Sequence, residues 1–95
     1  MFQGKYQASA TVNKKPSWTS KDKVIWYGFN HWLIGDGKYA VIYSLSYQSF
    51  PYDKEIQWYF NGKELENKKI KPNEIDVKCT MKEGEPVILE YKWLD

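Results

Sequence analysis

The chain contains few side chains that could carry out catalysis. His31 is its only histidine and Cys79 is its only cysteine, so every nucleophilic scheme that needs an imidazole base would depend on His31. His31 lies in a predicted hairpin turn beside Trp32, where a solvent-facing or ring-stacked histidine is expected. Cys79 shares a predicted strand face with Val77 and Met81, which is typical of a small core residue. We therefore predict that the protein is not an enzyme.

Neither the carboxylates nor the possible metal ligands have the spacing of a catalytic or metal site. Three carboxylate pairs lie two residues apart on predicted strands or turns, a spacing typical of solvated faces and not of a catalytic cleft: Glu64 and Glu66, Glu74 and Asp76, and Glu83 and Glu85. One cysteine cannot form an internal disulfide, and one histidine with one cysteine lacks the spacing of a structural zinc site. We expect no metal and no cofactor.

The chain is rich in aromatic side chains. They make up 18% of its residues, as eight Tyr, five Trp and four Phe. They concentrate in residues 24–37, VIWYGFNHWLIGDG, which read as two strands around a loop at residues 28–31. With a loop of that length, three cross-strand pairs are predicted: Tyr27 with Trp32, Trp26 with Leu33, and Ile25 with Ile34.

This predicted hairpin is apolar on both faces. Neighbouring residues of a strand point to opposite sides, so Tyr27 and Trp32 share one face while Trp26 and Leu33 share the other. A small two-layer domain covers only one face of each sheet. The other face therefore needs a cover, and three alternatives stand: a loop of the chain bearing Trp18, or Phe50 and Tyr52; a ligand; or a second subunit in a homodimer.

Period-two alternation of apolar and polar residues extends over most of the chain and predicts short strands. The predicted strands cover residues 2–12, 24–27, 32–34, 39–47, 55–60, 74–81 and 87–93. Asn61 and Gly62 predict a two-residue hairpin turn that would pair Trp58 with Leu65. No segment has the 3.6-residue period of an amphipathic helix. We predict an all-β fold, a single small antiparallel barrel or sandwich of about 7–8 strands formed by residues 1–95.

Composition limits the partners. The length of 95 residues suits one domain, and the net charge of +2 excludes a strongly acidic or basic tail. All 14 basic residues are Lys, and the absence of Arg argues against sequence-specific nucleic-acid recognition. No apolar run approaches the length of a membrane span and no signal peptide is visible. We expect no membrane partner, and either a cytoplasmic protein or a piece of a larger or secreted one.

The first forty residues show a further pattern. Its elements are Gly4 and Tyr6, then a Pro-x-Trp at Pro16 and Trp18, a Trp-Tyr at Trp26 and Tyr27, and a Trp-x-Ile-Gly from Trp32 to Gly35. This pattern resembles a small aromatic-rich β module found repeatedly in eukaryotic multidomain proteins. The resemblance implies an interaction module without catalysis, and it supplies no catalytic residue.

Together these features predict a non-catalytic binding module that contacts a protein or a carbohydrate through the aromatic hairpin. The predicted contact residues are Trp26, Tyr27 and Trp32 as an apolar platform, Phe29 and His31 at the loop tip, Trp18 as a flanking wall, and Asn30 and Asp36 as polar anchors. The alternative is a small inhibitor or a nucleotide-sequestering sponge, such as a phage-encoded anti-defence protein, because aromatic rings also stack on bases.

Overall fold

In the computed structural model, residues 2–44, 50–53, 55–61, 69–70 and 74–94 are described. They form nine strands: β1 (Gly4–Ala8), β2 (Trp18–Ser20), β3 (Lys23–Gly28), β4 (His31–Gly35), β5 (Ala40–Ser44), β6 (Trp58–Phe60), β7 (Lys69–Ile70), β8 (Ile75–Lys82) and β9 (Glu85–Trp93). The described part of the chain contains no helix.

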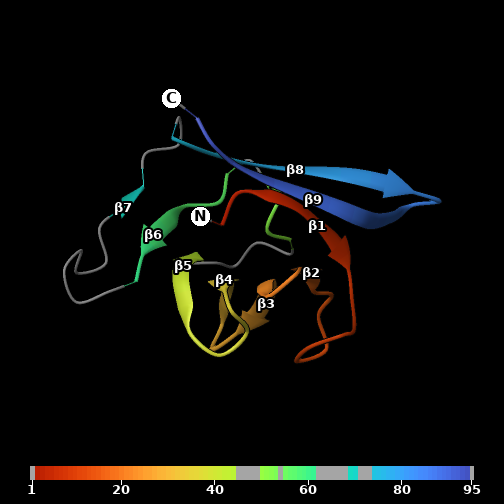
Figure 1. The fold of residues 1–95 in the computed structure, drawn as a ribbon, viewed down its shortest axis with the longest axis horizontal. Coiled ribbons are helices and arrows are strands. Elements are labelled where there is room, and N and C mark those ends of the chain that lie inside the picture. Colours follow the sequence, from red (N-terminus) through yellow and green to blue (C-terminus); the bar gives the residue numbers. More distant parts are fainter. Residues whose placement is uncertain (1, 45–49, 54, 62–68, 71–73, 95) are drawn as a thin grey trace.

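All nine strands belong to one sheet with the order β7-β6-β5-β4-β3-β2-β1-β9-β8, and every neighbouring pair is antiparallel. The sheet curls strongly, in the manner of a half-barrel (Figure 1). The predicted all-β antiparallel fold is therefore confirmed. Strands β7 and β8 are the two ends of the sheet, and the β8–β9 hairpin runs along the longest dimension of the molecule, 40 Å.

The core lies on the inner face of the curl. Its buried members come from all nine strands and from the segment before β6: Tyr6, Trp18, Ile25, Trp32, Ile34, Ile42, Ile56, Trp58, Ile70, Ile75, Leu89 and Tyr91. Trp18 and Trp32 are completely buried, and their ring centroids lie 6.0 Å apart. Since the chain has no disulfide among its described residues, burial of this aromatic and aliphatic core is the main source of stabilisation.

The segment at residues 50–56 covers the open side of the inner face. The Tyr52 ring meets the Trp18 ring edge to face at 6.5 Å, Phe50 stacks on Tyr52, and Pro51 is buried. The Asp53 backbone closes the segment by donating to the Phe50 carbonyl and accepting from the Ile56 amide. The predicted covering loop thus exists, but it packs on the inner face and leaves the outer face of the hairpin to other neighbours.

The β3–β4 hairpin has the predicted register, with Tyr27 opposite Trp32, Trp26 opposite Leu33 and Ile25 opposite Ile34. Its turn is shorter than predicted. Gly28 pairs with His31, so only Phe29 and Asn30 form the turn, both with positive φ, 52° and 64°. This is the type I′ geometry whose twist matches that of the flanking strands.

The predicted pairing of Trp58 with Leu65 is wrong. Strand β6 pairs with β7, and the residue opposite Trp58 is Ile70. Ile70 is buried at 1% exposure and belongs to the core with Trp58. A fully apolar partner on the inner face therefore sets the register at this end of the sheet, and the Asn-Gly signal does not.

Candidate functional site

A row of large side chains crosses the outer face of the sheet. Trp26 on β3 lies opposite Leu33 on β4, Leu33 lies opposite Tyr43 on β5, and Tyr43 lies opposite Tyr59 on β6. Residues opposite each other in an antiparallel sheet point to the same face. We call these four residues the outer row. None of them belongs to the buried core cluster, which lies on the inner face.

At the Trp26 end of the outer row the side chains are almost fully buried. Trp26 is 9% exposed and Leu33 is 7% exposed. Their side chains lie over Gly28, since a Cβ at Gly28 would stand 3.4 Å from both the Leu33 Cδ1 and the Trp26 Nε1 atoms. Asn13 approaches the same place and donates from Nδ2 to the Tyr27 carbonyl at 2.8 Å. The turn at Asn13 therefore supplies part of the cover that the sequence required for this face.

The other end of the outer row is half-buried and carries the rings that can be reached. Tyr43 and Tyr59 stack with centroids 5.5 Å apart and planes 19° apart, and the His31 ring meets Tyr43 at 5.5 Å and 77°. His31 is fixed by a 2.6 Å hydrogen bond between Nδ1 and the Ser44 carbonyl. Because a carbonyl only accepts, Nδ1 is the donor in this hydrogen bond.

Exposed apolar side chains surround these rings. Phe29 at the hairpin turn is 92% exposed, Tyr39 is 72% exposed, and Val41 is 37% exposed. Val41 and Tyr43 lie two residues apart on β5 and share the outer face. The outer surface thus combines a stacked pair of rings with exposed apolar side chains, all from β4, β5, β6 and the turns beside them. We call the set His31, Tyr39, Val41, Tyr43 and Tyr59 the outer aromatic patch.

The predicted platform residues and the flanking Trp18 differ in how exposed they are in the structure. Trp18 and Trp32 have no exposed surface and belong to the core; we therefore leave them out of the contact surface. Trp26 shows only its margin. Tyr27 is half-buried on the inner face, edge to face with Trp32 at 5.2 Å, and the Lys15 ammonium lies 5.5 Å from its ring centroid.

The predicted tip and anchor residues are accessible. Phe29 and Asn30 are exposed, and His31 is half-buried in contact with Tyr43. Asp36 is exposed but engaged, since its Oδ1 accepts from the Tyr39 amide at 2.8 Å and the Lys38 amide at 2.9 Å. These two hydrogen bonds hold the pKa of the Asp36 carboxyl below its ordinary value. Asp36 therefore shapes the turn that presents Tyr39.

Sequence reasoning did not select Tyr39, Val41, Tyr43 or Tyr59 as contact residues. The alternation in residues 39–47 places Tyr39, Val41 and Tyr43 on one face of a strand, which was the available signal. Of that predicted strand, Leu45 and Tyr47 lie outside the described residues. The contact between Tyr43 and Tyr59 arises only when β6 pairs with β5.

Other possible chemistries find little support in the described residues. Cys79 is half-buried beside Met81, with Sγ 3.6 Å from the Met81 Sδ atom, and burial raises the pKa of its thiol. No group of three or more His, Cys, Asp or Glu side chains within that part of the chain could hold a metal ion. Nor do those residues include a helix that could cross a membrane.

A groove of about 910 Å³ lies on the inner side of β8, between that strand and the segment at residues 51–58. Its walls are mainly apolar, with Ile56 and Trp58 on one side and Val77 and Cys79 on the other.

A comparison of the chain with protein-family models, with curated proteins and with solved structures found no match.

Proposed function

We propose that this protein is a non-catalytic interaction module that binds another protein through the outer aromatic patch. The observation that carries the proposal is the outer row, in which register alone aligns Leu33, Tyr43 and Tyr59 on the face away from the core. A sheet face turned to solvent normally carries polar residues. A cluster of aromatic and aliphatic side chains there marks a contact surface.

The residue types suit a protein partner. Tyrosine supplies a large apolar ring and a hydroxyl, loses little rotamer entropy on binding, and is enriched among the residues that dominate interface energies. Tyr43 is already held in place by Tyr59 on one side and by His31 on the other. A surface that is ordered before binding spends less free energy on ordering during binding.

Ring geometry favours a protein over a carbohydrate or a nucleotide. Sugars and bases stack on an open ring face, but Tyr43 and Tyr59 cover one face of each other by stacking at 5.5 Å. The stacked pair therefore has less open ring face for a sugar or a base than two separate rings would have. Such a surface suits packing between the side chains of a second protein, and an inhibitor of another protein would use it in the same way.

A displayed library of random peptides tests the proposal. Peptides selected on the protein should lose binding by about 10- to 30-fold with Tyr39→Ser and with Tyr43→Ser, the loss expected for a central interface residue. The matched control is Leu94→Ser, because Leu94 is also exposed, at 41%, but lies at the end of β9, away from the patch.

Three outcomes contradict the proposal. One is a set of peptides whose binding responds to Leu94→Ser and not to Tyr43→Ser. The second is binding on a glycan array that Tyr43→Ser abolishes. The third is quenching of tryptophan fluorescence by nucleotides that weakens as salt is added, since salt screens lysine contacts to phosphate.

A further inference from the structure

Strand β8 has one side without a partner strand among the described residues, since it is the last strand of the sheet order. The Leu94 amide donates to the Glu74 carbonyl, and hydrogen-bonded pairs alternate along an antiparallel ladder. In the register of β8 with β9, Asp76, Lys78 and Thr80 therefore bond to β9. The backbone amides and carbonyls of Ile75, Val77 and Cys79 point toward the open side, where they form a template for another strand.

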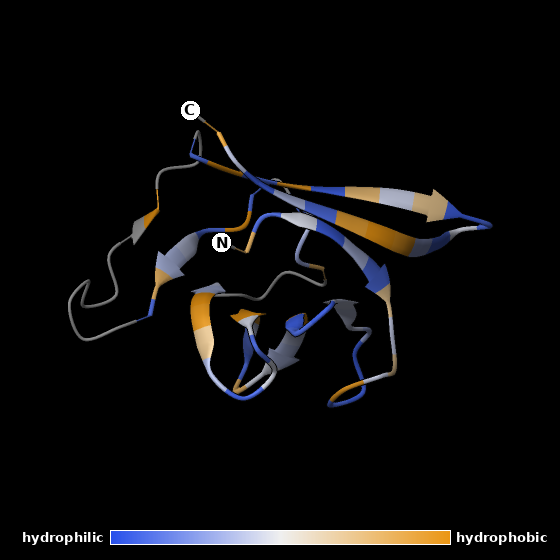
Figure 2. Cartoon of the chain, in the orientation of Figure 1, coloured by the Kyte–Doolittle hydropathy of each residue, from blue (hydrophilic) through white to orange (hydrophobic). Residues whose placement is uncertain are grey.

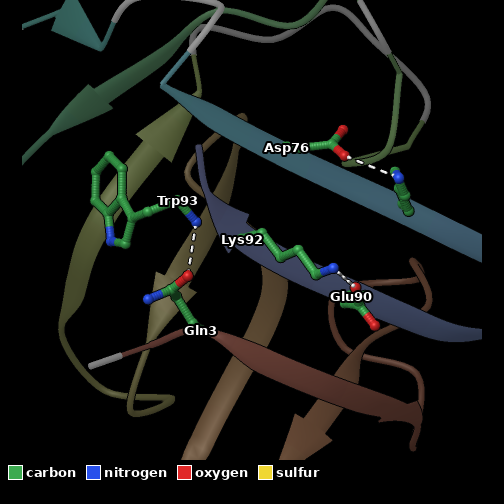
Figure 3. A network of polar contacts seen from close by, with 6 residues as sticks. Gln3, Asp76, Glu90, Lys92 and Trp93 are labelled. Atoms are coloured by element: carbon green, nitrogen blue, oxygen red, sulfur yellow. Dashed lines mark hydrogen bonds and ion pairs between the residues drawn. The ribbon is translucent and has the colours of Figure 1, made fainter. Parts of the chain in front are cut away.

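The outer face of the β8–β9 ribbon carries charges of alternating sign. Asp76 lies opposite Lys92, Lys78 lies opposite Glu90, and Glu90 lies opposite Lys5 of β1. Ion pairs also form within each strand: Lys92 with Glu90 at 2.8 Å (Figure 3) and Lys78 with Asp76 at 3.7 Å. The Lys92 bond and the charges of Lys92, Lys5 and Lys78 lower the pKa of Glu90. Each charge therefore has neighbours of the opposite sign, except at the open side of β8.

We propose that β8 pairs antiparallel with β8 of a second copy of this chain, centred on Val77, so that the two sheets join into one. In this register Val77 faces its own counterpart, and Ile75 faces Cys79 of the other copy. These residues are the ones whose backbone groups point outward, so the pairing satisfies them reciprocally across a two-fold axis. On the outer face, Asp76 of each copy comes to lie opposite Lys78 of the other.

Charge selects this register over its neighbours. A shift that centres the axis on Asp76 places the two copies of Asp76 opposite each other, and a shift that centres it on Lys78 does the same for two lysines; like charges directly opposite are destabilising. A further shift toward Thr80 meets the irregularity between Thr80 and Met81, where the β8 ladder changes register. The Val77-centred pairing is the one that extends the alternation of charge across the boundary, from Glu90 and Lys78 to the second Asp76.

The inner face is complementary as well. Val77 and Cys79 are half-buried at the mouth of the groove beside β8, and Met81 is 54% exposed. A second β8 brings the same apolar side chains to the same face, where they pack against the first set and remove both from water. Figure 2 shows hydrophobic and hydrophilic residues alternating along β8, so two paired copies of β8 keep an apolar side and a charged side.

Two charge variants test the pairing by their self-association and by their mixing. Asp76→Lys places two lysines opposite two lysines across the axis, and Lys78→Asp places two aspartates opposite two aspartates. The dimer affinity of each variant alone should be at least about tenfold weaker than that of the parent chain. An equal mixture of the two should recover dimers, because every cross-axis pair is then of opposite sign. Sedimentation or light scattering measures the masses.

Recovery by mixing separates the proposal from simple misfolding, since two misfolded variants would not form a defined heterodimer. A chain that is monomeric at all concentrations tested overturns the proposal. So does a dimer whose stability is unchanged in both charge variants, or one that Tyr43→Ser disrupts, which would assign self-association to the outer aromatic patch. Failure of the pairing leaves the proposed function intact, because Tyr43 lies on β5, six strands away from β8 in the sheet order.

A crosslink fixes the register independently. In a Cys79→Ser background, Asp76→Cys mixed with Lys78→Cys should form a disulfide-linked heterodimer under oxidation, because residues of a non-hydrogen-bonded pair have close Cα atoms. Asp76→Cys or Lys78→Cys alone should crosslink far less. Efficient crosslinking of Asp76→Cys with itself would indicate the Asp76-centred register and contradict the proposed one.

Discussion

The β3–β4 and β8–β9 hairpins are built from the same elements but occupy opposite situations in the sheet. Both have a tight turn with positive φ, at Phe29 and Asn30 in the first and at Glu83 and Gly84 in the second. The first is apolar on both faces and lies in the middle of the sheet, whereas the second is apolar on one face, charged on the other, and ends the sheet at β8.

This difference shows how the outer face of a hairpin determines its neighbours. Trp26 and Leu33 are buried although they face away from the core, because adjoining strands and the turn at Asn13 surround them. On the outer face of the second hairpin, Asp76 pairs with Lys78 and Lys92 pairs with Glu90, and these side chains stay partly or largely exposed. A central position covers apolar groups on both faces, while an edge position suits a ribbon whose outer face is charged and can select a register.

The largest expected effect separates the two faces of the first hairpin. Trp32→Ala should lower the free energy of unfolding by about 3–5 kcal/mol, because it empties a fully enclosed site in the core. Trp26→Ala should lower the free energy of unfolding by a smaller amount, at least about 1 kcal/mol less than Trp32→Ala does. The neighbours of Trp26 on the outer face can relax toward solvent. Urea unfolding followed by circular dichroism gives both values.

If Trp32→Ala does not fold, Trp32→Phe and Trp26→Phe give the same comparison with smaller cavities. An equal loss for the two positions would show that the outer face is packed as tightly as the core. The Trp26 end of the outer row would then be a second interior, and the difference between the two faces of this hairpin would disappear.

The second expected effect concerns two buried phenols where β9 meets β1. The Tyr6 hydroxyl donates to the Phe2 carbonyl at 2.6 Å, whereas the buried Tyr91 hydroxyl has no hydrogen-bond partner in the described part of the chain. Tyr6→Phe should therefore destabilise the protein by about 0.5–1.5 kcal/mol, and Tyr91→Phe should leave stability unchanged or raise it by up to about 1 kcal/mol. Thermal unfolding of the matched pair measures the difference.

Alkaline pH gives a second measure of the same two phenols. Burial raises the pKa of Tyr6 from 10.0 to about 12, with a further contribution from Asp22, and burial raises the pKa of Tyr91 still more. A raised pKa means stability that is complete below pH 10 and is lost as pH rises toward 12. Tyr91→Phe should therefore lose less stability than the parent over this range. An unchanged alkaline slope would show that Tyr91 is solvated in the folded state.

The register of the β3–β4 hairpin could be predicted because its apolar pattern leaves one pairing that keeps Ile25 and Ile34 together in the core. The two-residue turn was missed because Phe29 is an uncommon residue for positive φ, which Asn and Gly adopt more readily. Local sequence patterns therefore predicted the register of the two strands but not the length of the turn between them.

The outer aromatic patch could not be predicted from alternation alone. Tyr43 and Tyr59 meet because β5 and β6 pair in one particular register, and the connection between these strands is too long to fix a register by turn geometry. The cover over Trp26 depends on Asn13, whose side chain bonds a carbonyl fourteen positions away. Contacts of this kind follow from the closed fold, and local sequence carries no signal of them.

The smallest expected effect lies in the turn that follows the first hairpin. Hydrogen bonds from the Tyr39 and Lys38 amides lower the pKa of Asp36, so its contribution is present above the unfolded pKa and is lost as pH falls through the lower folded value. Asp36→Asn keeps an acceptor oxygen but removes the charge. The variant should melt slightly below the parent at pH 7, and the two should converge at acid pH once the carboxyl is protonated. A gap of equal size at both pH values would show that the amide alters the turn by its shape, and that Tyr39 is presented without help from the Asp36 charge.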